Sequence, residues 1–348
     1  MILVDRNIFS LSFLNEVRLK FKSNLIFLIM FFLVSCTNDS LIQINGMTMG
    51  TTYTIKIVND STNSNTKSIE KGIDSILYLI DFQMSTYNSN SEIVRFNNIT
   101  EYLPISDGLK NILKISREYT ATTNGAFDIT VAPLVELWGF KNFNNNWVPP
   151  IKSDIDSLLR FIGNEHWYID KSAVYKRNKD LKIDLNAIAK GYGVDQIARY
   201  LMRLGYKSFI VEIGGEVYCH GLKYNVKPWK VGIELPDFSS GNLLETVSLE
   251  NFALATSGDY RNYYNYKGKV YSHIINPQTG SPVEHNLVSA TVIAPTCLEA
   301  DVLATSLMVM GVDKAITLIN KSNNVECLLV QRFKDNTLKI SKSKGFDQ

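Results

Sequence analysis

The apolar residues of this chain repeat with two different periods, and this mixture constrains the fold more than any other feature. In residues 69–82 and 109–120 they recur every three or four positions, as on the buried face of an amphipathic helix. In residues 52–57 they alternate with polar residues, as in a strand with one buried face. The two patterns follow one another without the regular alternation of a parallel βαβ protein, so the sequence predicts an α+β fold.

Local residue signals, such as helix caps, predict the remaining helices and strands. Gly205 is a residue type favoured at a helix C-terminus, and Thr296-Cys297-Leu298-Glu299 has the spacing of a capping box. No internal repeat of about 20–50 residues is apparent. These signals predict a hairpin over 44–58, two strands over 208–219 separated by Gly214-Gly215, a helix over 188–204, a strand over 288–294 and a helix that runs from Thr296 to Gly311.

The composition argues against several classes of protein. The 348 residues are 45% hydrophobic and 20% charged, which is ordinary for a globular protein and too apolar for a disordered one. Lys and Arg number 36 against 34 Asp and Glu, so no bulk positive charge is available to hold nucleic acid, and none is expected as a partner. The four Cys lack CxxC spacing and no two of the four His have helical spacing, which disfavours a zinc site.

The first segment predicts export. Basic residues within 18–22 precede an apolar run over 25–34, which is too short to span a bilayer as a helix of about 20 residues. A basic flank and a short apolar core are typical of a secretory signal. The run ends in Leu33-Val34-Ser35-Cys36, which resembles a bacterial lipobox, where Cys36 would be acylated and become the N-terminus. The alternative is an ordinary or uncleaved signal peptide.

These features define the expected domains. Residues 1–35 would be the lipoprotein signal, 36–43 a polar tether and 44–340 one folded domain. Removal of residues 1–35 leaves equal numbers of basic and acidic residues. The mature protein is therefore expected to be exported and held by lipid at the periplasmic side of a bacterial membrane.

The last predicted helix carries the clearest candidate for a metal site. Asp301 and Thr305 are one turn apart, so they face the same side of the helix. A carboxylate and a hydroxyl are hard oxygen ligands, which suit Mg²⁺. The same pair is also compatible with a carboxylate stabilised by the helix N-terminus beside a packed Thr. The spacing alone leaves both interpretations open.

Two further motifs could hold a ligand. In residues 124–128 a Gly, an aromatic ring and a carboxylate could grip a planar heterocycle, or they could form a helix C-terminal turn with Phe127 in the core. Residues 184–191 are expected where a strand enters a helix. Free N–H groups at the helix start together with Lys190 would favour an anion there, although an ordinary cap and a surface Lys also fit.

Three more segments also allow either a functional or a purely structural interpretation. Gly214-Gly215-Glu216 allows either close approach of the backbone or a tight bend. His273, expected where a strand runs into a turn, could act near neutral pH or be structural. Residues 255–260 supply hydroxyls and a carboxylate in a loop, or form only a turn. No Gly-x-Ser-x-Gly sequence is present, which disfavours a hydrolase triad.

Taken together and in this order, the segments resemble the ApbE family of FAD:protein FMN transferases. The resemblance covers residues 44–312 almost completely, and the lipobox fits it. It rests on residues 47–53, Met84-Ser85-Thr86-Tyr87 with Ser91-Glu92, 125–128 with 137–140, 184–191, 213–216, 255–260, 272–280 and Ala300-Asp301 with Thr305.

The resemblance implies a two-lobed α+β architecture with a flavin in the cleft between the lobes. It implies Mg²⁺-dependent transfer of FMN from FAD to a Thr or Ser hydroxyl of a target protein, with release of AMP. Mg²⁺ would be held by Asp301, Thr305 and the backbone carbonyl of Ala187. By matched position, FAD would contact Met49, Tyr87, Ala126, Phe127, Asp128, Asp184, Lys190 and, through its backbone, Ile275.

The catalytic assignments are Asp301, as metal ligand, and His273, as the candidate base that accepts the acceptor's proton. Asp259 is the competing base. One departure from the family is Asn276-Pro277, where many relatives have Asp-Pro, which puts the role of that side chain in doubt. Position 187 is commonly Gly, Ser or Thr, and Ala suffices if only its carbonyl binds metal.

The expected acceptor is a membrane redox subunit of a sodium-pumping NADH:quinone reductase or an Rnf-type complex, with a short Ser/Thr-rich motif. Two other functions stay open. An exported FAD pyrophosphatase would use the same site with water as nucleophile. A non-catalytic flavin-binding lipoprotein would bind FAD without reaction, but it would not need the metal pair Asp301 and Thr305.

Overall fold

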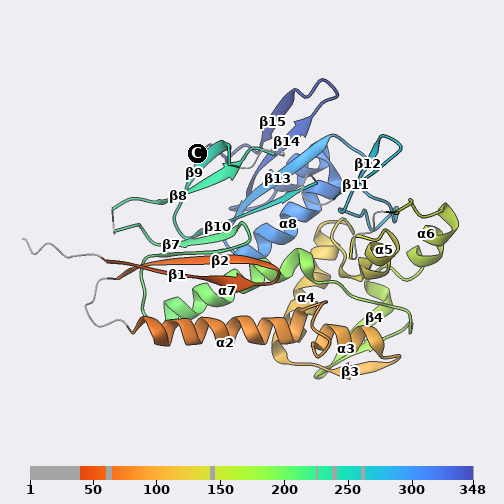
Figure 1. The fold of residues 1–348 in the computed structure, drawn as a ribbon, viewed down its shortest axis with the longest axis horizontal. Coiled ribbons are helices and arrows are strands. Elements are labelled where there is room, and N and C mark those ends of the chain that lie inside the picture. Colours follow the sequence, from red (N-terminus) through yellow and green to blue (C-terminus); the bar gives the residue numbers. More distant parts are fainter. Residues whose placement is uncertain are drawn as a thin grey trace, which may run out of the picture. The chain divides into compact units, whose positions relative to one another are not determined.

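A computed structural model describes residues 40–59, 65–141, 146–224, 226–236, 241–259 and 263–347. From Leu41 onward the chain forms one compact unit in which helices and antiparallel sheets are mixed (Figure 1). The predicted α+β class is therefore confirmed. The predicted signal segment and Cys36 lie outside the described residues, as do 142–145 of the predicted loop before Pro149.

An eight-stranded sheet organises this unit. Its first strand begins at Ser40, so part of the predicted tether is already strand. Phe346 is buried, so the folded unit also continues beyond the predicted end at residue 340. The strand order is β1 (Ser40–Thr48), β2 (Thr51–Asn59), β6 (Phe209–Ile213), β7 (Glu216–His220), β10 (Phe252–Gly258), β13 (Leu287–Ala294), β14 (Glu326–Arg332) and β15 (Leu338–Lys342).

Three smaller sheets flank the large one. Each of them pairs its strands antiparallel. They are β3 (Tyr102–Pro104), β5 (Ala173–Lys176) and β4 (Trp167–Asp170); β8 (Trp229–Glu234) and β9 (Leu243–Leu249); and β11 (Tyr263–Tyr266) and β12 (Lys269–Ser272).

The helices confirm the predicted periodic segments and add shorter ones. Their bounds are α2 (Thr66–Met84), α3 (Glu92–Asn98), α4 (Asp107–Thr122), α5 (Ala132–Leu137), α6 (Lys152–Leu159), α7 (Asn186–Arg203), α8 (Cys297–Met310) and α9 (Val312–Ile319), with 3₁₀ turns at Ile129–Val131 and Asn164–His166. Helix α7 packs on α8 and on β6 and β7, whereas α8 packs on β10 and β13 (Figure 1). Because α8 is buried on nearly every side, its polar residues Asp301 and Ser306 are also removed from water.

The apolar interior has two main clusters. One lies between the large sheet and helices α2, α7 and α8. The other is built around α3, α4 and the sheet of β3 to β5. Ala126 belongs to the first cluster and its neighbour Phe127 to the second, so the segment that follows α4 lies where the two clusters meet.

Candidate active site

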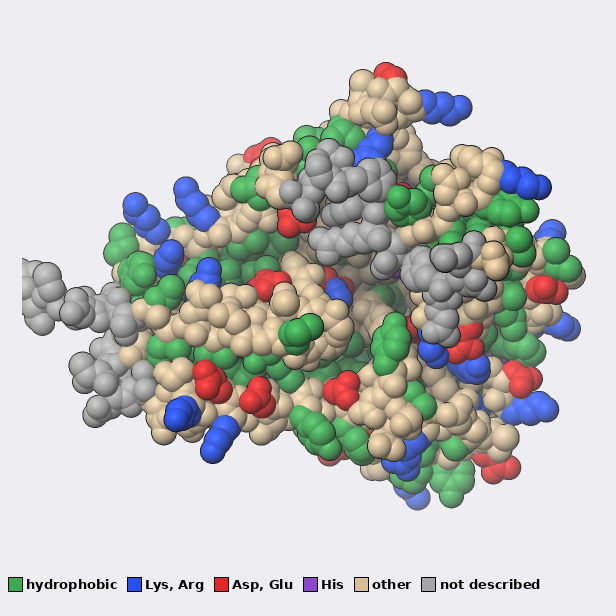
Figure 2. Space-filling view, viewed as in Figure 1, with side chains coloured by type: hydrophobic (Ala, Val, Ile, Leu, Met, Phe, Trp, Pro, Cys, Tyr) green, Lys and Arg blue, Asp and Glu red, His purple; other side chains and the backbone are tan. Residues whose placement is uncertain are grey.

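A cavity of about 560 Å³ gathers residues that lie far apart in the sequence. Every predicted FAD, metal and catalytic residue lines it. On the face of the molecule in Figure 2, acidic and basic side chains are intermixed and form no field of one sign. The predicted residues in the lining are Met49, Tyr87, Ala126, Phe127, Asp128, Asp184, Ala187, Lys190, His273, Ile275, Asp301 and Thr305.

The polar wall of the cavity is fixed by the way α8 begins. Thr296 caps the helix as predicted, because its side chain accepts the N–H of Glu299 at 3.3 Å. Asp195 of α7, which no sequence motif marks, accepts the N–H groups of Cys297 and Leu298 at 2.8 and 3.1 Å. Burial outweighs these bonds and raises the pKa of Asp195 to about 6. The middle of α7 is thus tied to the N-terminus of α8.

A glycine lets α7 and α8 approach at the metal site. The N–H of Gly191 donates to Oδ2 of Asp301 at 2.9 Å. A Cβ at position 191 would lie 2.4 Å from the carbonyl oxygen of Cys297 and 2.8 Å from Cβ of Asp301. In a regular helix the Gly191 N–H bonds to the carbonyl of Ala187. A carbonyl oxygen has two lone pairs, so the Ala187 carbonyl keeps capacity for another partner even when it accepts this helical bond.

The buried charges in this wall are one lysine and two carboxylates. Lys190 forms an ion pair with Oε1 of Glu216, and both Glu216 and Asp301 are only 3% exposed. Burial raises the pKa of Asp301, against the opposing effect of Lys190, and raises that of Glu216 to about 7. Burial by itself would lower the pKa of Lys190, but Asp301 and Glu216 outweigh it and raise that pKa.

The donors present fit a small hard cation. Asp301 supplies a carboxylate, Thr305 a hydroxyl and Ala187 a carbonyl, and Oε2 of Glu216 is buried without a hydrogen-bond partner. The hydroxyl of Thr305 lies 3.0 Å from that of Ser257, which belongs to the hydroxyl-rich segment 255–260 that the sequence analysis singled out. In the described part of the chain, no three or more His, Cys, Asp or Glu side chains are grouped so that they could hold a metal ion.

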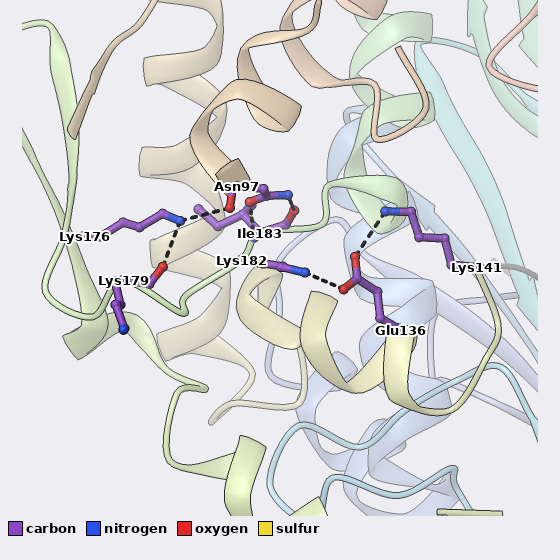
Figure 3. Close-up of polar contacts among 7 residues, drawn as sticks. All are labelled: Asn97, Glu136, Lys141, Lys176, Lys179, Lys182 and Ile183. Carbon is purple, nitrogen blue, oxygen red and sulfur yellow. Dashed lines mark hydrogen bonds and ion pairs between the residues drawn. The ribbon is translucent and has the colours of Figure 1, made fainter. Parts of the chain in front are cut away.

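The predicted strand before α7 is wrong. Residues 177–185 form no strand, and their backbone is held by side chains instead (Figure 3). Asn97 donates to the carbonyl of Ile183 at 2.9 Å and accepts its N–H at 2.8 Å. The N–H of Asp184 donates to the carbonyl of Ile129 at 2.7 Å. These contacts bring Asp184 to the cavity without a neighbouring strand.

Ion pairs hold the same segment against α5. Glu136 pairs with Lys182 at 2.6 Å and with Lys141 at 3.1 Å, as Figure 3 shows. Lys141 lines the cavity, although the sequence did not single it out. Asp184 accepts the N–H of Asn186 at 2.7 Å, and burial raises its pKa in spite of that bond. The start of α7 is therefore organised by Asp184.

The segment after α4 packs in the core and also borders the cavity. Phe127 is 3% exposed and packs in the core, yet it also borders the cavity. Asp128 accepts the N–H and the hydroxyl of Thr130 through Oδ1, at 2.8 and 2.6 Å, so that oxygen caps a 3₁₀ turn. Burial outweighs these bonds and raises the pKa of Asp128. Tyr87, in contrast, is 74% exposed at the cavity.

The two candidate bases, His273 and Asp259, differ in whether they line the cavity. His273 follows β12 directly, lines the cavity and contacts the edge of Phe140, with 6.5 Å between ring centroids. Asp259 is not among the described residues of the lining, and the cation that affects its pKa is Arg332. Burial raises the pKa of Asp259 to about 6. Asn276 accepts the N–H of Gln278 at 2.8 Å, so its side chain shapes a turn.

Comparison with known proteins agrees with this geometry. Residues 49–329 match the model of the ApbE family. A Vibrio cholerae protein named FAD:protein FMN transferase is 38% identical over 84% of this chain and 88% of its own length. One of the same name from Haemophilus influenzae is 36% identical over 90% and 93%. The solved Vibrio cholerae flavin transferase ApbE superposes with a TM-score of 0.80 at 36% identity, over 88% of this chain and 98% of that one.

The fold and the cavity thus define a mixed α+β transferase. The chain belongs to the ApbE family, and it is an enzyme. In the described residues no helix is long and apolar enough to cross a membrane.

Proposed function

We propose that this chain transfers FMN from FAD to a Thr or Ser hydroxyl of a target protein and releases AMP. The observation that carries the proposal is the convergence of Ala187, Lys190, Asp301 and Thr305, from two helices tied together by Gly191, on one wall of the cavity. The names of the relatives support the same activity.

FAD would enter the cavity with its flavin ring against apolar and aromatic groups. Met49, Ala126 and Phe127 supply such surface, and the exposed Tyr87 can close over the ring. Asp128 and Asp184 offer carboxylate oxygens to the polar edge of the ligand. Ile275, at the turn after His273, would contact it through the backbone.

Mg²⁺ would be held by Asp301, Thr305 and the carbonyl of Ala187. When bound, it would withdraw charge from the diphosphate and orient it for in-line attack. Gly191 holds Asp301 in position through its N–H. Lys190 stays charged because two carboxylates raise its pKa, so it can offset the negative charge on departing AMP.

The acceptor hydroxyl must lose a proton as it attacks. Its oxygen forms a bond to the phosphorus on the FMN side, and the bond from that phosphorus to the bridging oxygen breaks, so the electron pair leaves with AMP. His273 would take the hydroxyl proton, a role worth about 10²–10⁴-fold. His273 lines the cavity and Asp259 does not, which favours His273.

The proposed partner rests on the family resemblance, and the proposed location rests on the predicted leader. The acceptor would be a membrane redox subunit of NADH:quinone reductase or Rnf type, with a Ser/Thr-rich motif. Acylation of Cys36 would hold the enzyme on the periplasmic side of a bacterial membrane, where such an acceptor domain can reach the cavity. Radiolabelled fatty acid incorporated into the wild type but not into Cys36→Ala would support the anchor.

Product analysis distinguishes this reaction from its alternatives. The enzyme is incubated with FAD and Mg²⁺, with and without an acceptor domain, and AMP and free FMN are quantified. Transfer predicts AMP in proportion to modified acceptor, with little free FMN. Equal amounts of free FMN and AMP without acceptor would indicate a pyrophosphatase, and unchanged FAD in all mixtures would indicate a binding protein.

A further inference from the structure

Glu216 is a buried carboxylate that borders the cavity, and in the steps above it serves only to keep Lys190 charged. It is the first residue of β7 and is 3% exposed. The turn that precedes it has φ of +62° at Gly214 and +105° at Gly215, which only Gly adopts readily. The N–H of Gly214 donates to Thr52 at 3.0 Å and fixes the turn to β2. The backbone thus holds Glu216 firmly at the cavity.

The two oxygens of this carboxylate differ. Oε1 pairs with Lys190. Oε2 is buried and has no hydrogen-bond partner among the described residues. An ionised carboxylate can accept about four hydrogen bonds, and a buried oxygen without any is unfavourable. Because Glu216 lines the cavity, a group bound there can supply the missing partner.

The local charge indicates the sign of that group. Glu216 and Asp301 are both buried and both act on Lys190, so two carboxylates share one lysine. The wall therefore has an excess of one negative charge when both are ionised. A cation with hydrogen-bond donors in its own hydration shell would satisfy the excess charge and Oε2 together.

We propose that Oε2 of Glu216 accepts a hydrogen bond from a water ligand of the divalent cation held by Asp301, Thr305 and Ala187. Glu216 is then a positioning residue that orients both Lys190 and the hydrated ion. The proposal rests on the metal site of the proposed function. Residues in this position typically contribute 10–100-fold to metal affinity.

The test measures metal binding without the reaction. Mn²⁺ is titrated into the full chain without FAD, and free Mn²⁺ is followed by electron paramagnetic resonance. Glu216→Gln keeps an acceptor for Lys190 but loses the charge, and it should raise the Kd at least about tenfold. Glu245→Gln is the matched control, because Glu245 also pairs with a lysine, Lys342 at 2.8 Å, and neither residue lines the cavity. It should keep the wild-type Kd.

Lys190→Met separates a direct effect from one through the lysine. If Glu216 acts on the ion's water shell, Glu216→Gln weakens Mn²⁺ binding in the Lys190→Met background as well. An unchanged Kd in that background would overturn the proposal, as would a wild-type Kd for the single variant.

The same titration separates two kinds of failure. Binding that Asp301→Asn abolishes and Glu216→Gln leaves intact would refute only the role of Glu216. No saturable binding to the wild type would refute the cation site of the proposed function, and this proposal with it. Thermal unfolding of each variant confirms that the titrated protein is folded.

Discussion

Two buried lysines show how differently this fold treats the same charge. Lys176, at the end of β5, donates to the carbonyls of Asn97 and Lys179 at 3.3 and 3.4 Å (Figure 3). It lies 4.9 Å from the ring of Phe96. Burial lowers its pKa to about 8. Lys190 has two carboxylates beside it, and its pKa is raised.

The difference separates a structural cation from one suited to an anionic substrate. Carbonyl dipoles hold Lys176 in place but do not compensate its desolvation, so its charge is easily lost. At the cavity, Asp301 and Glu216 keep Lys190 charged at neutral pH. The region around Lys176 fixes the segment that leads to α7, whereas the region around Lys190 lines the cavity.

The largest expected effect is at the metal ligand. Asp301→Asn keeps the size of the side chain but removes the charge, so flavin transfer to the acceptor should fall by more than about 10³-fold. The unfolding midpoint should not fall, because a buried carboxylate is costly. Initial rates at saturating Mg²⁺ check this. Normal transfer by the variant would show that the metal assignment is wrong.

The second effect tests the two lysines directly. Lys190→Met should lower kcat/KM about 10²-fold, because charge on the leaving phosphate loses its partner. Lys176→Met should change kcat/KM by less than about threefold. Steady-state kinetics of both variants measure the contrast. Equal losses of kcat/KM in the two variants would show that the two lysines do not differ in their importance for catalysis.

The third prediction concerns the contact of α7 with α8. Gly191→Ala places Cβ against backbone, so unfolding in urea should show a loss of about 3 kcal/mol. Gly193→Ala is the control, because its Cβ would first meet the flexible end of Met49 at 3.1 Å. It should cost less than about 1 kcal/mol. A smaller loss for Gly191→Ala than for the control would contradict the close approach described here.

The smallest effect is a pH dependence of stability. The pKa of Lys176 is lowered from 10.5 to about 8, so the unfolded chain binds its proton more tightly. Stability should therefore rise with pH across this interval, by about 2 kcal/mol between pH 8 and 10 relative to Lys176→Met. Urea unfolding of both proteins at several pH values measures the difference. A difference that stays constant would argue against the shifted pKa.

Local signals in the sequence predict much of this fold. Thr296 predicts the start of α8, and Gly205 the end of α7. The error before α7 has a physical cause. Leu181, Ile183 and Leu185 are all fully buried in alternation, as in a strand, but the backbone between them bonds to a side chain and to a 3₁₀ turn.

The site is predictable only in part. The family resemblance identifies residues that line one common cavity, because each belongs to a short motif. The partners of these residues lie elsewhere in the chain. Asp195, Ser257 and the pairing of Glu216 with Lys190 depend on how helices and strands meet, which local patterns do not encode. The Gly-Gly turn was the one signal that pointed to Glu216.

Mass spectrometry of an acceptor tests the central claim most directly. A candidate acceptor domain is incubated with this enzyme, FAD and Mg²⁺, and its intact mass and peptides are compared with those obtained with Asp301→Asn. Addition of one FMN to a single Thr or Ser, by the wild type alone, is the predicted result. An unmodified acceptor in a mixture where FAD has been cleaved to FMN and AMP would contradict the account.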